Sequence, residues 1–147
     1  MTTLAAVARR LSERARVAPG GARDAALARH PPPAELAYLV QRIGPAATLA
    51  LIEAAGGTRL HIPKSVHQGS RLARLIGLAA ARALVEWRGG EDVKIPLARA
   101  WRIRLLREEG HSYPAIARRL GITEKAVHAQ LQAASLTSAA AQLHLDI

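Results

Sequence analysis

The sequence of 147 residues contains no cysteine and no phenylalanine, and it has only two tryptophans and two tyrosines. Without cysteine it can form neither a disulfide bond nor a thiolate metal site, which fits a reducing cytoplasm. With so few aromatic side chains, the core must be built from alanine, leucine, isoleucine and valine. Such small aliphatic side chains favour closely packed helices over a large sheet, so we expect a mainly α fold.

Long apolar runs are also missing. No stretch approaches the roughly 20 consecutive apolar residues that a membrane helix needs. Near the N-terminus, charged side chains such as Arg9, Arg10 and Glu13 interrupt the apolar residues, so we expect no secretory signal. The sequence therefore predicts a cytoplasmic protein without a membrane partner.

Acidic side chains are scarce relative to basic ones. The chain has 11 Asp and Glu residues against 21 Lys and Arg residues, which gives a formal net charge of +10. This excess predicts attraction to a polyanion and an affinity that falls as salt rises.

Groupings of residues that carry catalysis are absent as well. His61 and His67 do not have the spacing of metal ligands on one helix, and no carboxylate cluster accompanies them. Glu53 and Glu86 occupy equivalent places in a repeat, which explains them better than acid-base chemistry does. We expect a protein that is not an enzyme and that binds no metal and no cofactor.

An internal repeat becomes visible when the chain is shifted over itself by 33 positions. The matching residues are Ile43, Gly44, Ala46, Ala47, Ala50, Leu51, Glu53, Gly56, Gly57, Ile62 and Pro63, which recur as Ile76, Gly77, Ala79, Ala80, Ala83, Leu84, Glu86, Gly89, Gly90, Ile95 and Pro96. Each copy reads as a helix, a Gly-Gly stop and a short alternating strand.

The helices of the two copies are predicted over Leu36–Ala55 and Leu72–Arg88, and the strands over Arg59–Ile62 and Asp92–Ile95. A strand this short needs a partner, because an isolated strand leaves its backbone groups unpaired. We predict that the two strands pair as an antiparallel ribbon, although a second chain could also supply the partner. The side chains expected to face a common apolar layer are Leu60, Ile62, Val93 and Ile95.

The stretch Ser112–Gln132 reads as two short helices joined by a tight turn, the pattern of a helix-turn-helix. Gly121 can take the left-handed conformation that ends a helix, and Thr123 can cap the next one. The expected buried face contains Ile116, Ala117, Leu120, Ile122, Val127 and Leu131. A preceding helix from Leu97, with Trp101 as its large core residue, would complete a three-helix unit.

The second helix of this pattern is shaped to lie in the major groove of double-stranded DNA. Residues on its outer face are the candidates for reading bases: Glu124, Lys125, His128 and Gln132. Lysine can donate to guanine, glutamine can pair with adenine, and glutamate can accept from cytosine. The candidates for contact with the DNA backbone are Ser112, Tyr113, Arg118, Arg119 and Thr123.

Three segments carry a resemblance to the Mor transcription activator family of Mu-like phages and prophages: Gly56–Lys64 (GGTRLHIPK), Gly89–Arg99 (GGEDVKIPLAR) and Gly110–Leu131 (GHSYPAIARRLGITEKAVHAQL). The resemblance implies a homodimeric, nucleoid-associated activator of phage or prophage genes. Its N-terminal part would dimerise through helices and a strand. Its C-terminal part would bind DNA beside a promoter and help to recruit RNA polymerase. The family pairs its strands between chains, whereas two copies in one chain could pair internally.

We divide the chain into four parts on these grounds. Residues 1–33 form an N-terminal arm, with an amphipathic helix over residues 3–18 and a proline-rich connector. Residues 34–97 form the duplicated dimerisation domain, 98–132 the helix-turn-helix domain, and 133–147 a tail that is either a packed helix or a frayed end. The alternative function is that of a phage assembly or DNA-packaging protein, which would use the helix-turn-helix for non-specific DNA contact or protein contact.

Overall fold

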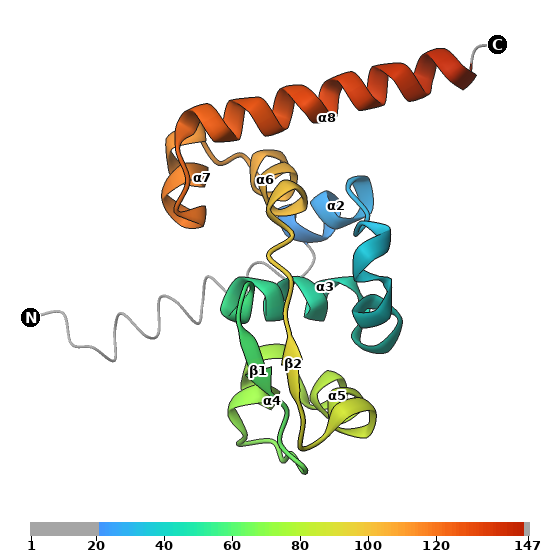
Figure 1. The fold of residues 1–147 in the computed structure, drawn as a ribbon, viewed down its shortest axis with the longest axis vertical. Helices are drawn as coiled ribbons and strands as arrows, with labels where there is room; N and C mark the ends of the chain where they lie inside the picture. Colours follow the sequence, from blue (N-terminus) through green and yellow to red (C-terminus); the bar gives the residue numbers. More distant parts are fainter. Residues whose placement is uncertain (1–20, 146–147) are drawn as a thin grey trace, which may run out of the picture. The chain divides into compact units, whose positions relative to one another are not determined.

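The structure is a computed structural model that describes residues 21–145, and the side chains of residues 21–136 (Figure 1). It is mainly helical with one two-stranded antiparallel sheet, as the sequence predicted. The elements are α2 (Ala22–Arg29), η1 (Ala34–Leu36), α3 (Ala37–Ala55), β1 (Arg59–His61), α4 (Arg71–Ile76), α5 (Leu78–Arg88), β2 (Asp92–Lys94), α6 (Arg99–Glu108), α7 (Tyr113–Leu120) and α8 (Glu124–Leu145). The amphipathic helix predicted over residues 3–18 lies outside the described residues.

The chain divides into two compact units. Residues 31–101 form the first, which we call the ribbon unit because it holds β1 and β2. Residues 21–30 together with residues 102–145 form the second, which we call the helical unit.

The two strands of the ribbon unit pair with each other within the chain, so the predicted internal pairing is confirmed (Figure 1). Each strand is one residue shorter than predicted, because a proline follows closely and cannot donate to the ladder. Ile62 and Ile95 therefore lie just beyond the strand ends, where both are buried. Val93 is also buried, and Leu60 is half-buried.

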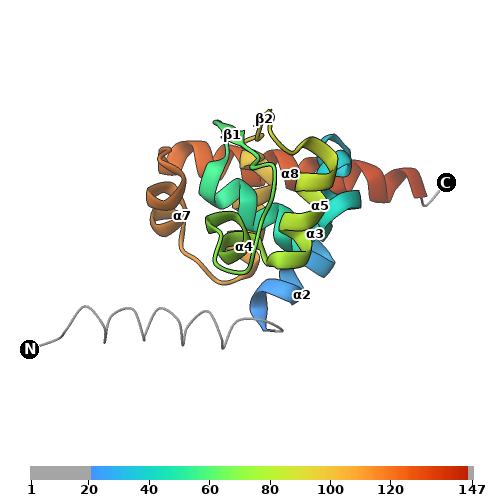
Figure 2. The ribbon, with the colours of Figure 1, turned by 90° about the horizontal axis from the view of Figure 1, so that it is seen from below.

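Both helices predicted for the two copies are interrupted, so their predicted continuity is wrong. Gly44 has φ 81° and ψ 166° inside α3, and Gly77 has φ 91° and ψ 155° between α4 and α5. Residues other than glycine rarely adopt such positive φ values. Pro45 follows the first of these glycines, and because it lacks a backbone N–H it suits the first turn of the helix that restarts there. Helix α3 packs against both α4 and α5, the helices on either side of Gly77, as Figure 2 also shows.

The helical unit packs α6, α7 and α8 around a small aliphatic core. Its buried members are Ile103, Leu106, Ile116, Ala117 and Val127, with Tyr113, Leu120, Ile122 and Leu131 partly buried against them. Trp101, which we expected in this core, is buried but lies outside this cluster. Helical geometry explains the difference, because Trp101 lies on nearly the opposite side of α6 from Ile103 and Leu106.

Polar contacts connect the end of α2 to the end of α6 within the same unit. The guanidinium of Arg29 donates a hydrogen bond to the carboxylate of Glu108, and His30 Nε2 lies 3.3 Å from the other carboxylate oxygen. These two hydrogen bonds hold the pKa of Glu108 below its ordinary value of 4.5. The carboxylate therefore stays ionised at an acidity that would protonate an ordinary glutamate.

The last helix, α8, runs without a break for 22 residues, through position 132, where we had placed a domain boundary. Between Lys125 and Asp146 the sequence contains no charged residue, no glycine and no proline, so no local signal stops the helix. In the described part of the chain, no helix has the length and apolarity needed to cross a membrane.

Candidate nucleic-acid interface

Two helices at the C-terminal side of the helical unit are joined by a turn whose geometry follows from its sequence. Gly121 ends α7 with φ 66° and ψ 36°, the left-handed conformation that glycine tolerates best. The backbone N–H of Ile122 then donates to the carbonyl of Ala117 at 3.0 Å. Ile122 packs against the buried core, and this contact fixes the direction of the chain as it enters α8.

Both helices have side-chain caps at their first turns. Ser112 Oγ accepts a hydrogen bond from the N–H of Ala115 at 3.3 Å, and Thr123 Oγ1 accepts one from the N–H of Ala126 at 3.1 Å. Thr123 is thus the cap of α8 that the sequence predicted. Each cap satisfies only one of the free N–H groups of its helix, so both helix starts keep a partial positive charge.

The four predicted base-reading residues are all exposed on α8. They lie within about one third of the helix circumference, given 100° per residue. Val127, which is fully buried, and Leu131, which is half-buried, lie beside this arc, about 60° and 20° beyond Glu124. The structure therefore brings together on one accessible face Glu124, Lys125, His128 and Gln132.

A stack of three side chains at the edge of this face was not foreseen from the sequence. The rings of Tyr113 and His128 meet edge to face with their centroids 4.1 Å apart. The guanidinium carbon of Arg107 lies 4.7 Å from the centre of the Tyr113 ring. Arg107 also donates to the carbonyl of His111 at 3.1 Å. Tyr113 thus holds the imidazole of His128 near the start of α7, and no spacing rule in the sequence signals this long-range contact.

The predicted backbone-contacting residues occupy three places around the two helices. Arg118 and Arg119 are exposed in the last turn of α7. The hydroxyl oxygens of Ser112 and Thr123 accept the capping hydrogen bonds, and each hydroxyl can still donate its own proton to a phosphate. Tyr113 is half-buried and takes part in the ring stack. From Arg99 to Gln132 the chain carries seven Arg or Lys residues against three Glu residues.

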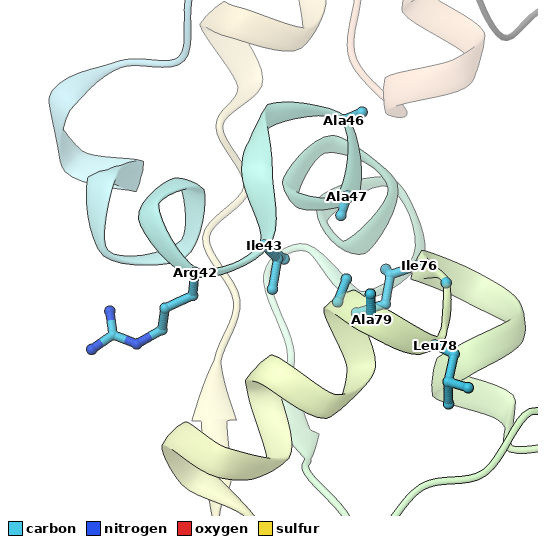
Figure 3. A pocket seen from close by; sticks show the side chains of 9 residues that line it. Arg42, Ile43, Ala46, Ala47, Ile76, Leu78 and Ala79 are labelled. Atoms are coloured by element: carbon cyan, nitrogen blue, oxygen red, sulfur yellow. The ribbon is translucent and has the colours of Figure 1, made fainter.

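An open pocket lies in the ribbon unit, and its chemistry differs from that of the exposed face of α8. This open pocket of about 500 Å³ is formed where the two glycine breaks meet (Figure 3). Its lining is apolar except for Arg42, whose guanidinium points away from it and donates to the Tyr38 carbonyl at 2.6 Å. Among the described residues, no group of three or more His, Asp or Glu side chains could hold a metal ion.

No family model matches the chain, and neither the curated proteins nor the solved structures include a match to it.

Proposed function

We propose that the protein is a sequence-specific DNA-binding regulator of transcription, in which α7 and α8 act as a helix-turn-helix. The observation that supports this proposal most is the row of exposed polar side chains on α8. It begins immediately after a capped helix start and lies on the exposed face of the helix, beside the buried stripe of Val127 and Leu131. A recognition helix needs this arrangement, because one side must pack on the domain while the other reaches base edges.

Each side chain of the row has a base that it can recognise. Lys125 can donate to O6 and N7 of guanine, Gln132 can form two hydrogen bonds with adenine, and Glu124 can accept from N4 of cytosine. His128 has less freedom, because its ring rests against Tyr113. We therefore assign it a contact at the margin of the groove, where a base edge or a phosphate lies within reach.

Affinity for the phosphate backbone comes from charges around the row. The exposed Arg118 and Arg119 supply cations in the last turn of α7, and the free N–H groups at the helix starts also favour anions. A net charge of +10 adds a long-range attraction that salt screens. These contacts position the protein on the duplex without distinguishing its sequence.

The resemblance to the Mor family extends the proposal to a physiological role. In that role the protein activates phage or prophage genes by binding beside a promoter and helping to recruit RNA polymerase. The implied homodimer remains a prediction, since the ribbon pairs within one chain and so gives no reason for a second.

A selection of bound duplexes from a random pool tests the proposal directly. A regulator enriches a defined motif. Lys125→Ala should then relax the preference at one base position and cost roughly 1–3 kcal/mol on the selected site. Lys94→Ala is the matched control, because it removes the same charge from an exposed site in the ribbon unit.

Two results would contradict the proposal. One is a pool without enrichment, together with ring-shaped or larger oligomers, which would favour the assembly or packaging protein. The other is an equal loss of affinity by Lys125→Ala on selected and random DNA, which would remove Lys125 from base reading.

A further inference from the structure

The ribbon unit is built with an approximate twofold symmetry that passes through its central strand pair. Leu60 lies opposite Val93, and these two residues are counterparts in the 33-residue repeat. On either side, Arg59 faces Lys94 and His61 faces Asp92, so the counterparts exchange places. A pair of strands has this register only when a twofold axis relates the two copies.

The backbone hydrogen bonds that close the ribbon obey the same symmetry. They come in two equivalent pairs: Gly57 N to Ile95 O and Gly90 N to Ile62 O, both 2.7 Å, and Ile62 N to Glu91 O and Ile95 N to Thr58 O, both 2.9 Å. Gly57 and Gly90 also share positive φ values of 80° and 83°. The likeness therefore extends from the register to individual bonds and backbone angles.

The buried side chains and the pocket repeat in the same way. Equivalent positions are buried in both copies, namely Leu39 and Leu72, Thr48 and Ala81, Leu51 and Leu84, and Ile62 and Ile95. Equivalent residues also line the pocket of Figure 3, namely Ile43 and Ile76, Ala46 and Ala79, and Ala47 and Ala80. The two copies thus pack against each other as the two subunits of an isologous dimer do.

The chain leaves the two copies differently. After Pro63, copy 1 continues through residues 64–70 directly into α4, the start of copy 2. After Pro96, the equivalent exit of copy 2, the chain continues into α6 and then into the α7 and α8 pair. We call the two paired copies the platform. The chain that leaves the platform after copy 2 therefore leads to a reading helix, whereas the chain that leaves copy 1 joins the two copies.

The two copies have also diverged in side chain at several equivalent positions. Leu49 is 2% exposed, whereas its counterpart Arg82 is exposed. Trp87 lies under the guanidinium groups of Arg42 and Arg88, at 4.5 and 5.0 Å from its ring centre, whereas its counterpart is Ala54. Copy 1 paired with a second copy 1 would lose these contacts. A short connection between the copies also favours pairing within one chain, because it keeps their effective concentration high.

We infer that a single chain forms the whole symmetric platform and reads DNA with one recognition helix, so that its target is one asymmetric half-site and not an inverted repeat. This inference rests on the proposed DNA-binding function and specifies its substrate. Inverted repeats in DNA mirror a twofold axis between two reading helices. Here the twofold axis within the ribbon unit relates the end of copy 2, from which the chain continues toward α8, to the end of copy 1, from which it continues into the connecting segment. The stoichiometry differs from that of the homodimer that the family resemblance implies.

The first test fixes the strand pairing in the full chain with the double variant Arg59→Cys, Lys94→Cys. The chain has no native cysteine, both positions are exposed, and the register places them opposite each other. Opposed residues of antiparallel strands lie about 4.5–5.5 Å apart between Cα atoms, which suits a disulfide bond. We expect oxidation to give a cross-linked monomer on a non-reducing gel. The single variant Arg59→Cys is the control and should keep a free thiol. Cross-linked dimers, or thiols that stay free in the double variant, would overturn pairing within the chain.

The second test uses the oxidised double variant and the unmodified chain in the selection from random DNA. We expect both to enrich the same single, non-palindromic motif and to bind a labelled duplex at one chain per site in sedimentation analysis. Enrichment of an inverted repeat bound by two chains would overturn this inference, but it would still agree with the proposed function as a DNA-binding regulator. A pool without enrichment would overturn the proposed function itself, so the two failures are distinguishable.

Discussion

Tyr113 shows how one side chain can serve the fold and the reading face together. Its ring packs on the core of the helical unit, meets the ring of His128 edge to face and lies under the guanidinium of Arg107. The sequence makes it a candidate for phosphate contact, with a role in the core as the rival. The geometry gives the ring a positioning role that does not depend on the hydroxyl.

Replacing this ring separates the two roles. Tyr113→Phe keeps both ring contacts, so the ratio of specific to random DNA affinity should stay unchanged. Tyr113→Ala frees His128 and should lower that ratio. The free energy that separates specific from random binding should shrink by roughly 0.5–1.5 kcal/mol, the usual strength of a contact between rings. Fluorescence anisotropy with a selected and a scrambled duplex measures both values. If Phe lowers the ratio as much as Ala does, the hydroxyl and not the ring is what matters.

At the scale of the elements, the cross-strand pairs of the ribbon differ in charge at its two ends. His61 Nδ1 and Asp92 Oδ1 lie 2.8 Å apart, whereas Arg59 and Lys94 face each other with like charges. Like charges directly opposite each other destabilise an antiparallel pair.

Reversing one of these charges should therefore stabilise the ribbon. We expect Lys94→Glu to raise the free energy of unfolding by roughly 0.2–1 kcal/mol, as measured by urea denaturation. Lys94→Gln is the control and should give a smaller gain, because it removes the repulsion without adding an attraction. An unchanged midpoint for the glutamate variant would show that the two side chains avoid each other in solution.

The contact between α2 and α6 should make stability depend on pH. Because Arg29 and His30 lower the pKa of Glu108 in the folded state, the ionised carboxylate favours folding above its unfolded pKa. That contribution is lost as the pH falls through the lower, folded value. Glu108→Gln should therefore lower the melting temperature at neutral pH and leave it less sensitive to acid. Melting curves from neutral to acidic pH measure this, with the exposed Glu124→Gln as control. Parallel curves for the wild type and Glu108→Gln would disprove the linkage.

Patterns that act locally allowed most of the elements to be predicted. Alternation and the Gly-Gly stops located the ribbon, and the oxygen of Thr123 located the start of α8. The break at Gly44 had a signal that we missed, because a Gly-Pro pair commonly interrupts a helix. The break at Gly77 could not be predicted, because a single glycine in an apolar run is compatible with a continuous helix. The position of Trp101 depends on which side of α6 faces α7 and α8, and the contact of His128 with Tyr113 depends on tertiary packing. The spacing of residues along the sequence predicts neither of these two features.

For the whole molecule, the excess of positive charge makes salt the most informative variable. Each phosphate contact that is lost should reduce the slope of log affinity against log salt by about 0.9 on duplex DNA. Arg118→Ala should show this change on selected and random sequences alike, whereas Arg82→Ala in the ribbon unit should not. Titrations at several salt concentrations measure the slopes, and an unchanged slope for Arg118→Ala would exclude it from the phosphate contacts.

The 33-residue distance between the paired strands has a consequence for biosynthesis. Strand β1 leaves the ribosome before β2 does, and at 5–20 residues per second the delay is about 2–7 s. During that interval Ile62 and the apolar residues around it have no partner strand to cover them. Neighbouring nascent chains on one messenger RNA then expose the same half-platform at high local concentration. Rapid translation between Pro63 and Pro96 would therefore protect the yield of correctly paired chains.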